Sequence, residues 1–167
     1  SGAFVDQLTG LASRRYFTMF MQREFSRSQR ANKPLALAVF DVDEFPKLES
    51  KIGKEPASSA LADMGARMKS ALRDYDLAAR YADGRIVVVL PETDRQAAED
   101  VVKRLHGLAT SVCADGRPVS VTVGLATFPE HGSTAEELVN SAHRALNRGK
   151  AECSNQVHTR EDLPKAA

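Results

Sequence analysis

Several features that would direct the interpretation of a sequence are scarce or absent in this chain of 167 residues. Its only two cysteines, Cys113 and Cys153, match no spacing of a metal or redox site, so we expect free thiols in a reducing compartment. No apolar run approaches the roughly 20 residues that span a bilayer, and no signal peptide is visible. A formal net charge of +1 gives no overall field that would attract a polyanion. We therefore expect a cytoplasmic protein that binds no nucleic acid and has no membrane segment in this domain.

The composition is that of one packed domain. Hydrophobic residues make up 43% of the chain, which is enough for a single core, and no internal repeat or low-complexity segment occurs. We expect the domain to cover residues 3–158 and the polar residues 159–167 to form a loose tail. Ser1-Gly2 has the look of an expression scar, which suggests a domain cut from a longer chain.

Hydrophobic periodicity and capping signals predict the order of the elements. Helices are expected over residues 13–30, 45–52, 57–72, 93–113 and 133–148, the last two opened by capping boxes at 93–96 and 133–136. Strands are expected over residues 35–42, 77–81, 86–90, 119–128 and 155–159. This order predicts an α/β protein of the α+β kind, with a central, mostly antiparallel five-stranded sheet surrounded by helices.

A hairpin is the strongest local signal in the chain. Asp83-Gly84 stands between two strand-like runs, and this dipeptide favours a type I′ turn with positive φ at both central residues. The stretch Arg73-Asp74-Tyr75-Asp76 lies at a fixed spacing before it. These two features become informative when the motifs around them are added.

Motifs along most of the chain resemble those of one family in their order. They are residues 6–11 (DQLTGL) with Arg14-Arg15, residues 40–45 (FDVDEF), Arg80-Tyr81 before the turn, residues 121–126 (VTVGLA) and residues 142–155. Together they resemble the GGDEF (diguanylate cyclase) family from about residue 6 to 158, and the resemblance implies the palm-like nucleotidyl-cyclase fold. The signature turn, however, reads Ala82-Asp83-Gly84-Arg85-Ile86 in this chain.

The resemblance implies an active site in which two Mg²⁺ ions hold the GTP phosphates, bound by the first Asp of D-x-D and by the third residue of the turn. Mg²⁺ prefers oxygen ligands, usually one or two carboxylates. Asp41 fits the first position, but Gly84 stands at the second and Arg85 replaces the neighbouring acid. Asp83 is one position away, and because side chains alternate faces along a hairpin, we expect its carboxylate to point elsewhere.

Other positions of the family's active site also differ. Glu49 and Ser58 stand where the family uses an Asn and an Asp to read guanine; a carboxylate cannot donate, and Ser lacks charge and reach. Ala82 and Ile86 complete the altered turn, while Lys150 matches a phosphate-contacting lysine. We therefore expect a degenerate active site with no catalytic residue, no metal and no functional Mg²⁺. The competing interpretation treats the carboxylates after residue 40 as a solvated strand end.

The R-x-x-D element at Arg73 and Asp76 is retained, and in the family it is a cyclic di-GMP binding site, or I-site. Arg offers a planar fork for guanine O6/N7 or phosphate, and Asp can accept from guanine N1–H and N2–H. Arg104 matches a further Arg that such members add from the next helix. We expect Arg73 and Asp76 at the end of a helix and exposed without ligand. The alternative is an ordinary surface ion pair.

Three functions remain open. The first is an inactive bacterial GGDEF domain that serves as a cyclic di-GMP receptor and signals to a protein partner, as in PopA-like cell-cycle adaptors. There, such a domain follows a receiver or sensor domain, and we expect one upstream here. The second is a weakly active cyclase, and the third is a ligand-independent interaction scaffold.

Overall fold

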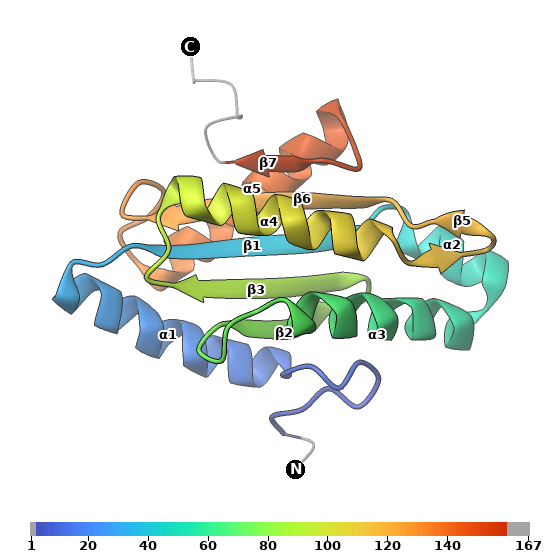
Figure 1. Ribbon diagram of the computed structural model, residues 1–167, viewed down its shortest axis with the longest axis horizontal. Helices are drawn as coiled ribbons and strands as arrows, with labels where there is room; N and C mark the ends of the chain where they lie inside the picture. The colour runs from blue at the N-terminus through green and yellow to red at the C-terminus, as the bar shows by residue number, and fades with distance from the viewer. Residues whose placement is uncertain (1–2, 160–167) are drawn as a thin grey trace.

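The computed structural model describes residues 3–159, so the predicted scar and residues 160–167 of the predicted tail lie outside the described part. The helices are α1 (Arg14–Ala31), α2 (Phe45–Ile52), α3 (Lys54–Ser70), α4 (Arg95–Thr110) and α5 (Ala135–Glu152). The strands are β1 (Leu35–Val42), β2 (Leu77–Ala82), β3 (Arg85–Pro91), β4 (Cys113–Ala114), β5 (Arg117–Pro118), β6 (Val121–Phe128) and β7 (Val157–Thr159). Figure 1 shows how they are arranged.

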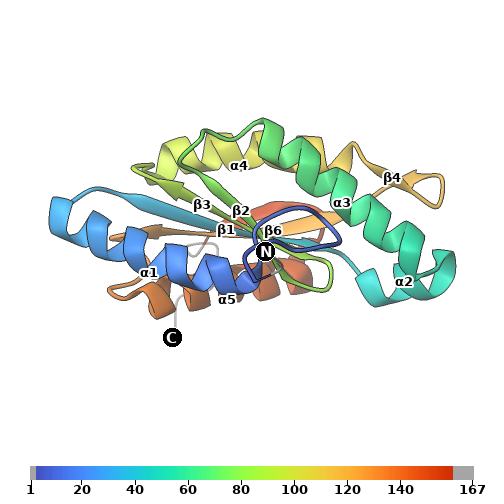
Figure 2. The ribbon, with the colours of Figure 1, turned by 90° about the horizontal axis from the view of Figure 1, so that it is seen from below.

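The predicted five-stranded sheet is confirmed, with the strand order β2-β3-β1-β6-β7. Its pairs are antiparallel except for β6 and β7, which run parallel. Helices α3 and α4 cover one face of the sheet and α1 and α5 the other, so the molecule has three layers (Figure 2). A small hairpin of β4 and β5 extends beyond the sheet (Figure 1). Among the described residues, no helix is both long and apolar enough to cross a bilayer.

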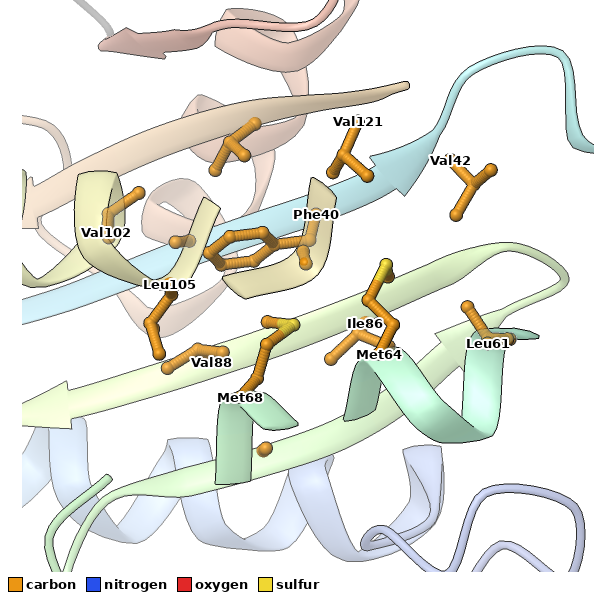
Figure 3. Close-up of a cluster of buried hydrophobic side chains, with 14 of the residues drawn as sticks. Phe40, Val42, Leu61, Met64, Met68, Ile86, Val88, Val102, Leu105 and Val121 are labelled. Atoms are coloured by element: carbon orange, nitrogen blue, oxygen red, sulfur yellow. The ribbon is translucent and has the colours of Figure 1, made fainter. Parts of the chain in front are cut away.

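Strand β1 is the centre of the sheet, and each of its residues is buried. Alternate side chains enter the two cores on either side of the sheet, as the pleat requires. Phe40 points into the core under α3 and α4, where Met64 and Met68 of α3 and Leu105 of α4 meet it (Figure 3). Because its neighbours β3 and β6 are equally covered, the strand reads as a nearly continuous apolar run.

Both predicted capping boxes are wrong by one residue. The N-cap of α4 is Asp94, not Thr93, and its carboxylate accepts a backbone N–H of the first turn at 2.9 Å. The N-cap of α5 is Thr134, not Ser133. Ser133 instead donates its N–H and its hydroxyl to the Glu137 carboxylate, and these bonds lower the pKa of Glu137. In each case the first hydroxyl has partners elsewhere, so the next residue caps the helix.

The hairpin between β2 and β3 forms as predicted, but its turn differs from type I′. Gly84 has φ +75°, whereas Asp83 is not among the residues of positive φ. The pairing register shifts between Arg80 and Ala82, so Tyr81 is an extra residue on the β2 side. A register shift of this kind increases the local twist and allows the turn without a left-handed residue at Asp83.

The predicted tail begins one residue too early, because Thr159 is buried in β7. The neighbouring His158 is also buried, and its Nε2 lies 2.8 Å from the carbonyl oxygen of Cys153. The ring of His158 occupies the space where a Cβ at Gly149 would lie. Strand β7 is thus held against α5 as well as against β6.

Gly124 of β6 lies where α5 comes closest to the sheet, and a Cβ there would overlap the backbone of Ala142 and Leu146. We expect Gly124→Ala to lower the free energy of unfolding by about 3 kcal/mol, because backbone cannot move aside as a side chain can. Urea denaturation measures the change. The control is Gly107→Ala in α4, which has open space around it and should raise stability by about 1 kcal/mol. Equal stability of the two variants would contradict this close packing of α5 on β6.

Candidate functional site

The sequence-predicted residues gather at the two ends of β3. Arg85 begins the strand, beside the end of β1, and Pro91 ends it, beside the turn that carries Arg73. Six steps of about 3.3 Å separate these ends by roughly 20 Å. The structure therefore places Asp41 and Arg85 at one end of β3 and the R-x-x-D turn at the other.

The Asp41 cluster consists of Asp41, Arg85 and Lys150. The carboxylate of Asp41 is 3.5 Å from Nε of Arg85 and in closer contact with Nζ of Lys150. Arg85 is placed there by register, since it is the cross-strand partner of Asp41. Lys150 reaches the same carboxylate from α5. Two cations from different elements thus neutralise one carboxylate whose side chain is 8% exposed.

The expectation of a solvated strand end is wrong for Asp41 and Asp43. Asp41 is buried, and Asp43 accepts the hydroxyls of Ser120 at 2.5 Å and Thr122 at 2.7 Å. Both follow from the position of β1, which is paired on each side up to its last residues. Of these three carboxylates only that of Glu44, the N-cap residue of α2, is exposed, and it pairs with Lys47 at 3.0 Å.

Gly84 leaves no side chain beside Asp41, and the fold restricts what could replace it. A Cβ at Gly84 would lie 2.8 Å from both Cβ and Cγ of Phe45, and the φ of +75° is strained for other residues. Within residues 3–159, no three His, Cys, Asp or Glu side chains come together so as to hold a metal ion. The nearby Asp41 carboxylate is paired with Arg85 and Lys150.

A cavity of about 370 Å³ next to the turn brings Glu49 and Ser58 together with Ala82 and Asp83. The sequence analysis assigned the first two to the family's guanine-reading positions, and they do face a common cavity. The Asp83 carboxylate is 89% exposed and lies 3.2 Å from Arg80. It therefore differs from Asp41 in both burial and partner. Ile86, the last residue of the motif, is buried in the core.

Arg73 and Asp76 lie in the turn after α3, not in the helix itself. Nε and Nη2 of Arg73 donate to both oxygens of the Asp76 carboxylate, with a shortest distance of 2.8 Å. Nη2 also donates to the hydroxyl of Thr93 at 2.8 Å and to the carbonyl of Pro91 at 3.2 Å. The Arg73 backbone N–H also donates to the Asp76 carboxylate at 2.8 Å. Hydrogen bonds from both the main chain and the side chain of Arg73 therefore hold Asp76 in place.

The expectation that both side chains are exposed holds for Arg73 alone. The Arg73 side chain is 44% exposed, but that of Asp76 is only 2% exposed, because the guanidinium covers it. The hydrogen bond to Asp76 raises the pKa of Arg73, so the side chain stays cationic. Its guanidinium carbon lies 4.4 Å from the centre of the exposed Tyr75 ring.

Arg104 is an exposed residue of α4. It follows the N-cap Asp94 by ten residues, which is about 15 Å along the helix axis. No hydrogen bond or ion pair within the described chain joins it to Arg73. A ligand that contacts both cations must extend along α4.

Sequence reasoning missed two residues that contact Arg73, namely Thr93 and Tyr75. Thr93 was taken for a helix cap, although its hydroxyl donates to the carbonyl of Pro91 and accepts from Arg73. Tyr75 lies inside the motif and is 53% exposed, which is unusual for a large ring. The position of Tyr75 between Arg73 and Asp76 in the sequence could have indicated that its ring lies next to Arg73.

The comparisons with known proteins agree with this fold. The model of the family "Diguanylate cyclase, GGDEF domain" matches residues 3–156. The cyclic di-GMP phosphodiesterase NbdA of Pseudomonas aeruginosa is 30% identical over 149 residues, which are 87% of this chain. The diguanylate cyclase SiaD of Pseudomonas aeruginosa, solved with its activator SiaC, superposes with a TM-score of 0.87 at 29% identity over 95% of this chain.

A second solved structure shows the fold at lower identity. The GGDEF domain of DgcB from Caulobacter crescentus, in complex with c-di-GMP, covers 95% of this chain and is itself 94% covered, with a TM-score of 0.88 at 20% identity. The chain spans only 19% of NbdA and 62% of the SiaD chain. Because the family model matches nearly the whole described chain and the fold agrees, the chain belongs to the diguanylate cyclase GGDEF domain family.

Proposed function

We propose that this chain is a catalytically inactive GGDEF domain that binds cyclic di-GMP and signals through a protein partner. The observation that carries the proposal is the state of Arg73. Nε and Nη2 of its guanidinium are held by Asp76, Thr93 and Pro91, while the side chain remains 44% exposed. A cation fixed in this way loses little conformational entropy when it binds an anion or a guanine edge.

The ligand's chemistry fits this turn. Cyclic di-GMP offers two guanine edges and two phosphates, and the Arg fork can bind either group. Asp76 is already saturated by Arg73, so its first role is to orient that side chain. The Asp76 carboxylate accepts hydrogen bonds from guanine N1–H and N2–H only when the Arg73 guanidinium moves away from it. Arg104 supplies a second cation to a ligand that extends along α4, for which a stacked pair of dinucleotides has the length.

The loss of catalysis is supported by the Asp41 cluster. Arg85 and Lys150 hold the carboxylate that would bind the metal, and Gly84 supplies no second one. Against this stands the name of SiaD, which is a diguanylate cyclase. A weakly active cyclase is therefore the second candidate, and turnover of GTP separates the two.

A protein partner belongs to the same proposal. SiaD was solved with its activator SiaC, which makes protein contact with a GGDEF protein physically reasonable for this chain as well. A degenerate domain can act only by changing what it contacts, since it releases no product. We propose a cytoplasmic setting with a receiver or sensor domain upstream, as in other GGDEF effectors.

The first test is turnover. With GTP and Mg²⁺ we expect no cyclic di-GMP above a control without protein, because removing groups that act together costs many orders of magnitude in rate. Gly84→Glu should not restore activity, since Phe45 crowds that position and Glu49 and Ser58 remain at the guanine-reading positions. Chromatography of the reaction mixture measures the product. Accumulation by the wild type would favour the weakly active cyclase.

The second test concerns metal. Folding should not depend on Mg²⁺, because two protein cations already neutralise Asp41. We expect the melting temperature to be the same in Mg²⁺ and in EDTA, measured by calorimetry. A decrease of several degrees in EDTA would mean that a metal ion displaces Arg85 and Lys150 from the carboxylate.

The third test is binding, measured by titration calorimetry with cyclic di-GMP. Arg73→Ala should weaken binding most, by about 1–3 kcal/mol for each bidentate pair of hydrogen bonds that Arg73 makes to the ligand. Asp76→Asn should weaken it less and should also lower stability, because it releases Arg73.

Two control variants test whether the loss of affinity is specific to the R-x-x-D turn. Arg67→Ala removes an exposed Arg of α3 whose guanidinium donates to Ser111, and it should leave affinity unchanged. Asp41→Ala should do the same, since it lies at the other end of β3. If the wild type shows no binding at high micromolar ligand, the ligand-independent scaffold is the better description.

A further inference from the structure

Helix α1 holds most of the excess positive charge of the domain. It contains five arginines, and Glu24 is its only acidic residue, so the helix has a net charge of +4. Because the whole chain has a formal net charge of +1, the residues outside α1 together carry −3. The two signs of charge are therefore separated in the fold, although the overall charge is close to zero.

Three of these arginines lie in a row on the outer side of α1. Arg23, Arg27 and Arg30 follow one another at i, i+4 and i+7, so they share one side of the helix, and each is exposed. The opposite side of α1 is buried against the sheet. Among the described elements, no helix or strand covers the outer side (Figure 2). We call this row, with Met19 one turn before it, the α1 stripe.

The arginines of the α1 stripe are not neutralised within the domain. Arg23 lies with its guanidinium carbon 5.7 Å from the centre of the Phe20 ring, and none of the three pairs with a carboxylate of residues 3–159. Like charges at i, i+4 destabilise a helix, and an opposing negative surface would relieve this repulsion. The arginines that do pair with an acidic side chain of the chain are Arg73, Arg80, Arg85, Arg95 and Arg148.

Met19 adds an apolar contact at one end of the α1 stripe. Its side chain is 54% exposed. Phe4, which is 42% exposed, packs edge-on against Tyr16, one turn before Met19. From Met19 to Arg30 the stripe extends about 16 Å along the helix axis, which is three helical turns. Met and Arg are enriched in protein interfaces whereas Lys is depleted, and α1 contains five arginines and no lysine.

We propose that the α1 stripe is a docking surface for an acidic amphipathic helix of a partner protein. Carboxylates at i, i+4 and i+7 of the partner helix face Arg23, Arg27 and Arg30, and an apolar residue beside them packs against Met19. Each guanidinium can bind a carboxylate through two parallel hydrogen bonds. This inference rests on the proposed function only for the existence of a protein partner, whose chemistry it names.

An anionic membrane and a nucleic acid fit this surface less well. A helix that binds at a lipid surface buries its apolar face among the headgroups. The apolar face of α1, which includes Phe17, Met21 and Phe25, is packed against the sheet instead. The α1 stripe contains no aromatic residue on which a base would stack, and the net charge of −3 outside α1 opposes a long polyanion.

The first test measures the fluorescence anisotropy of two labelled helical peptides in the absence of cyclic di-GMP. One peptide carries a leucine and three glutamates on one face at the spacing of the α1 stripe, and the other has glutamines in place of the glutamates. The glutamate peptide should bind in a saturable way. The glutamine peptide should bind at least about tenfold more weakly, and high salt should weaken the glutamate peptide similarly. Equal binding of both peptides, or no binding of the first at hundreds of micromolar, would overturn the proposal.

Variants locate the surface. Arg23→Glu combined with Arg30→Glu should weaken binding of the glutamate peptide at least about tenfold, because attraction becomes repulsion at two positions. The matched control combines Arg67→Glu with Lys69→Glu, two exposed residues of α3, and changes the net charge of the domain by the same amount. This control should bind as the wild type does. An equal loss in both double variants would mean that only the overall charge matters and would overturn the proposal. Met19→Ala should weaken binding severalfold without changing any charge.

Three further measurements separate this surface from other ligands and from the proposed function. Vesicles containing phosphatidylserine and a single-stranded oligonucleotide should bind the wild type more weakly than the glutamate peptide does. If either binds the wild type but not the Arg23→Glu, Arg30→Glu variant, while the glutamate peptide binds neither protein, the surface belongs to that ligand and the proposal is wrong. Cyclic di-GMP should bind this variant as it binds the wild type. If the wild type binds the glutamate peptide but no cyclic di-GMP, the docking surface stands and the proposed receptor function fails.

Discussion

The burial of β1 between β3 and β6 is the constraint on which the rest of the structure depends. Both faces of this strand are covered by helices, so a carboxylate near its end enters a region of low dielectric and must be neutralised. The negative charge of Asp41 is neutralised by Arg85 and by Lys150 of α5. The antiparallel register of β1 and β3 places Arg85 directly opposite Asp41. The same contacts tie the hairpin turn and the last helix to the central strand.

The R-x-x-D turn follows the same physical rule at the other end of β3. Asp76 is nearly buried, and the cation that pairs with it is the one that remains available to a ligand. Because the pair forms without ligand, Asp76 contributes first by holding Arg73 in place.

Local patterns predicted most elements well, and the exceptions have physical reasons. Strand β1 and helix α2 begin and end where the sequence analysis placed them, because an apolar run and a glycine mark their limits. The caps of α4 and α5 were each displaced by one residue, since a hydroxyl can serve a helix or another partner and the local sequence does not decide which. The turn at Asp83 was predicted from a dipeptide preference that the extra residue at Tyr81 overrides.

The sequence by itself determined the family, the order of the elements and the identity of the residues at the turn, because these depend on spacing and residue type. Only the tertiary structure decided how those residues are paired. Asp41 meets Lys150 across more than a hundred residues, and Arg73 meets Thr93 across twenty. The burial of Asp76 was equally hidden, because the exposure of a charged side chain depends on which elements pack over it.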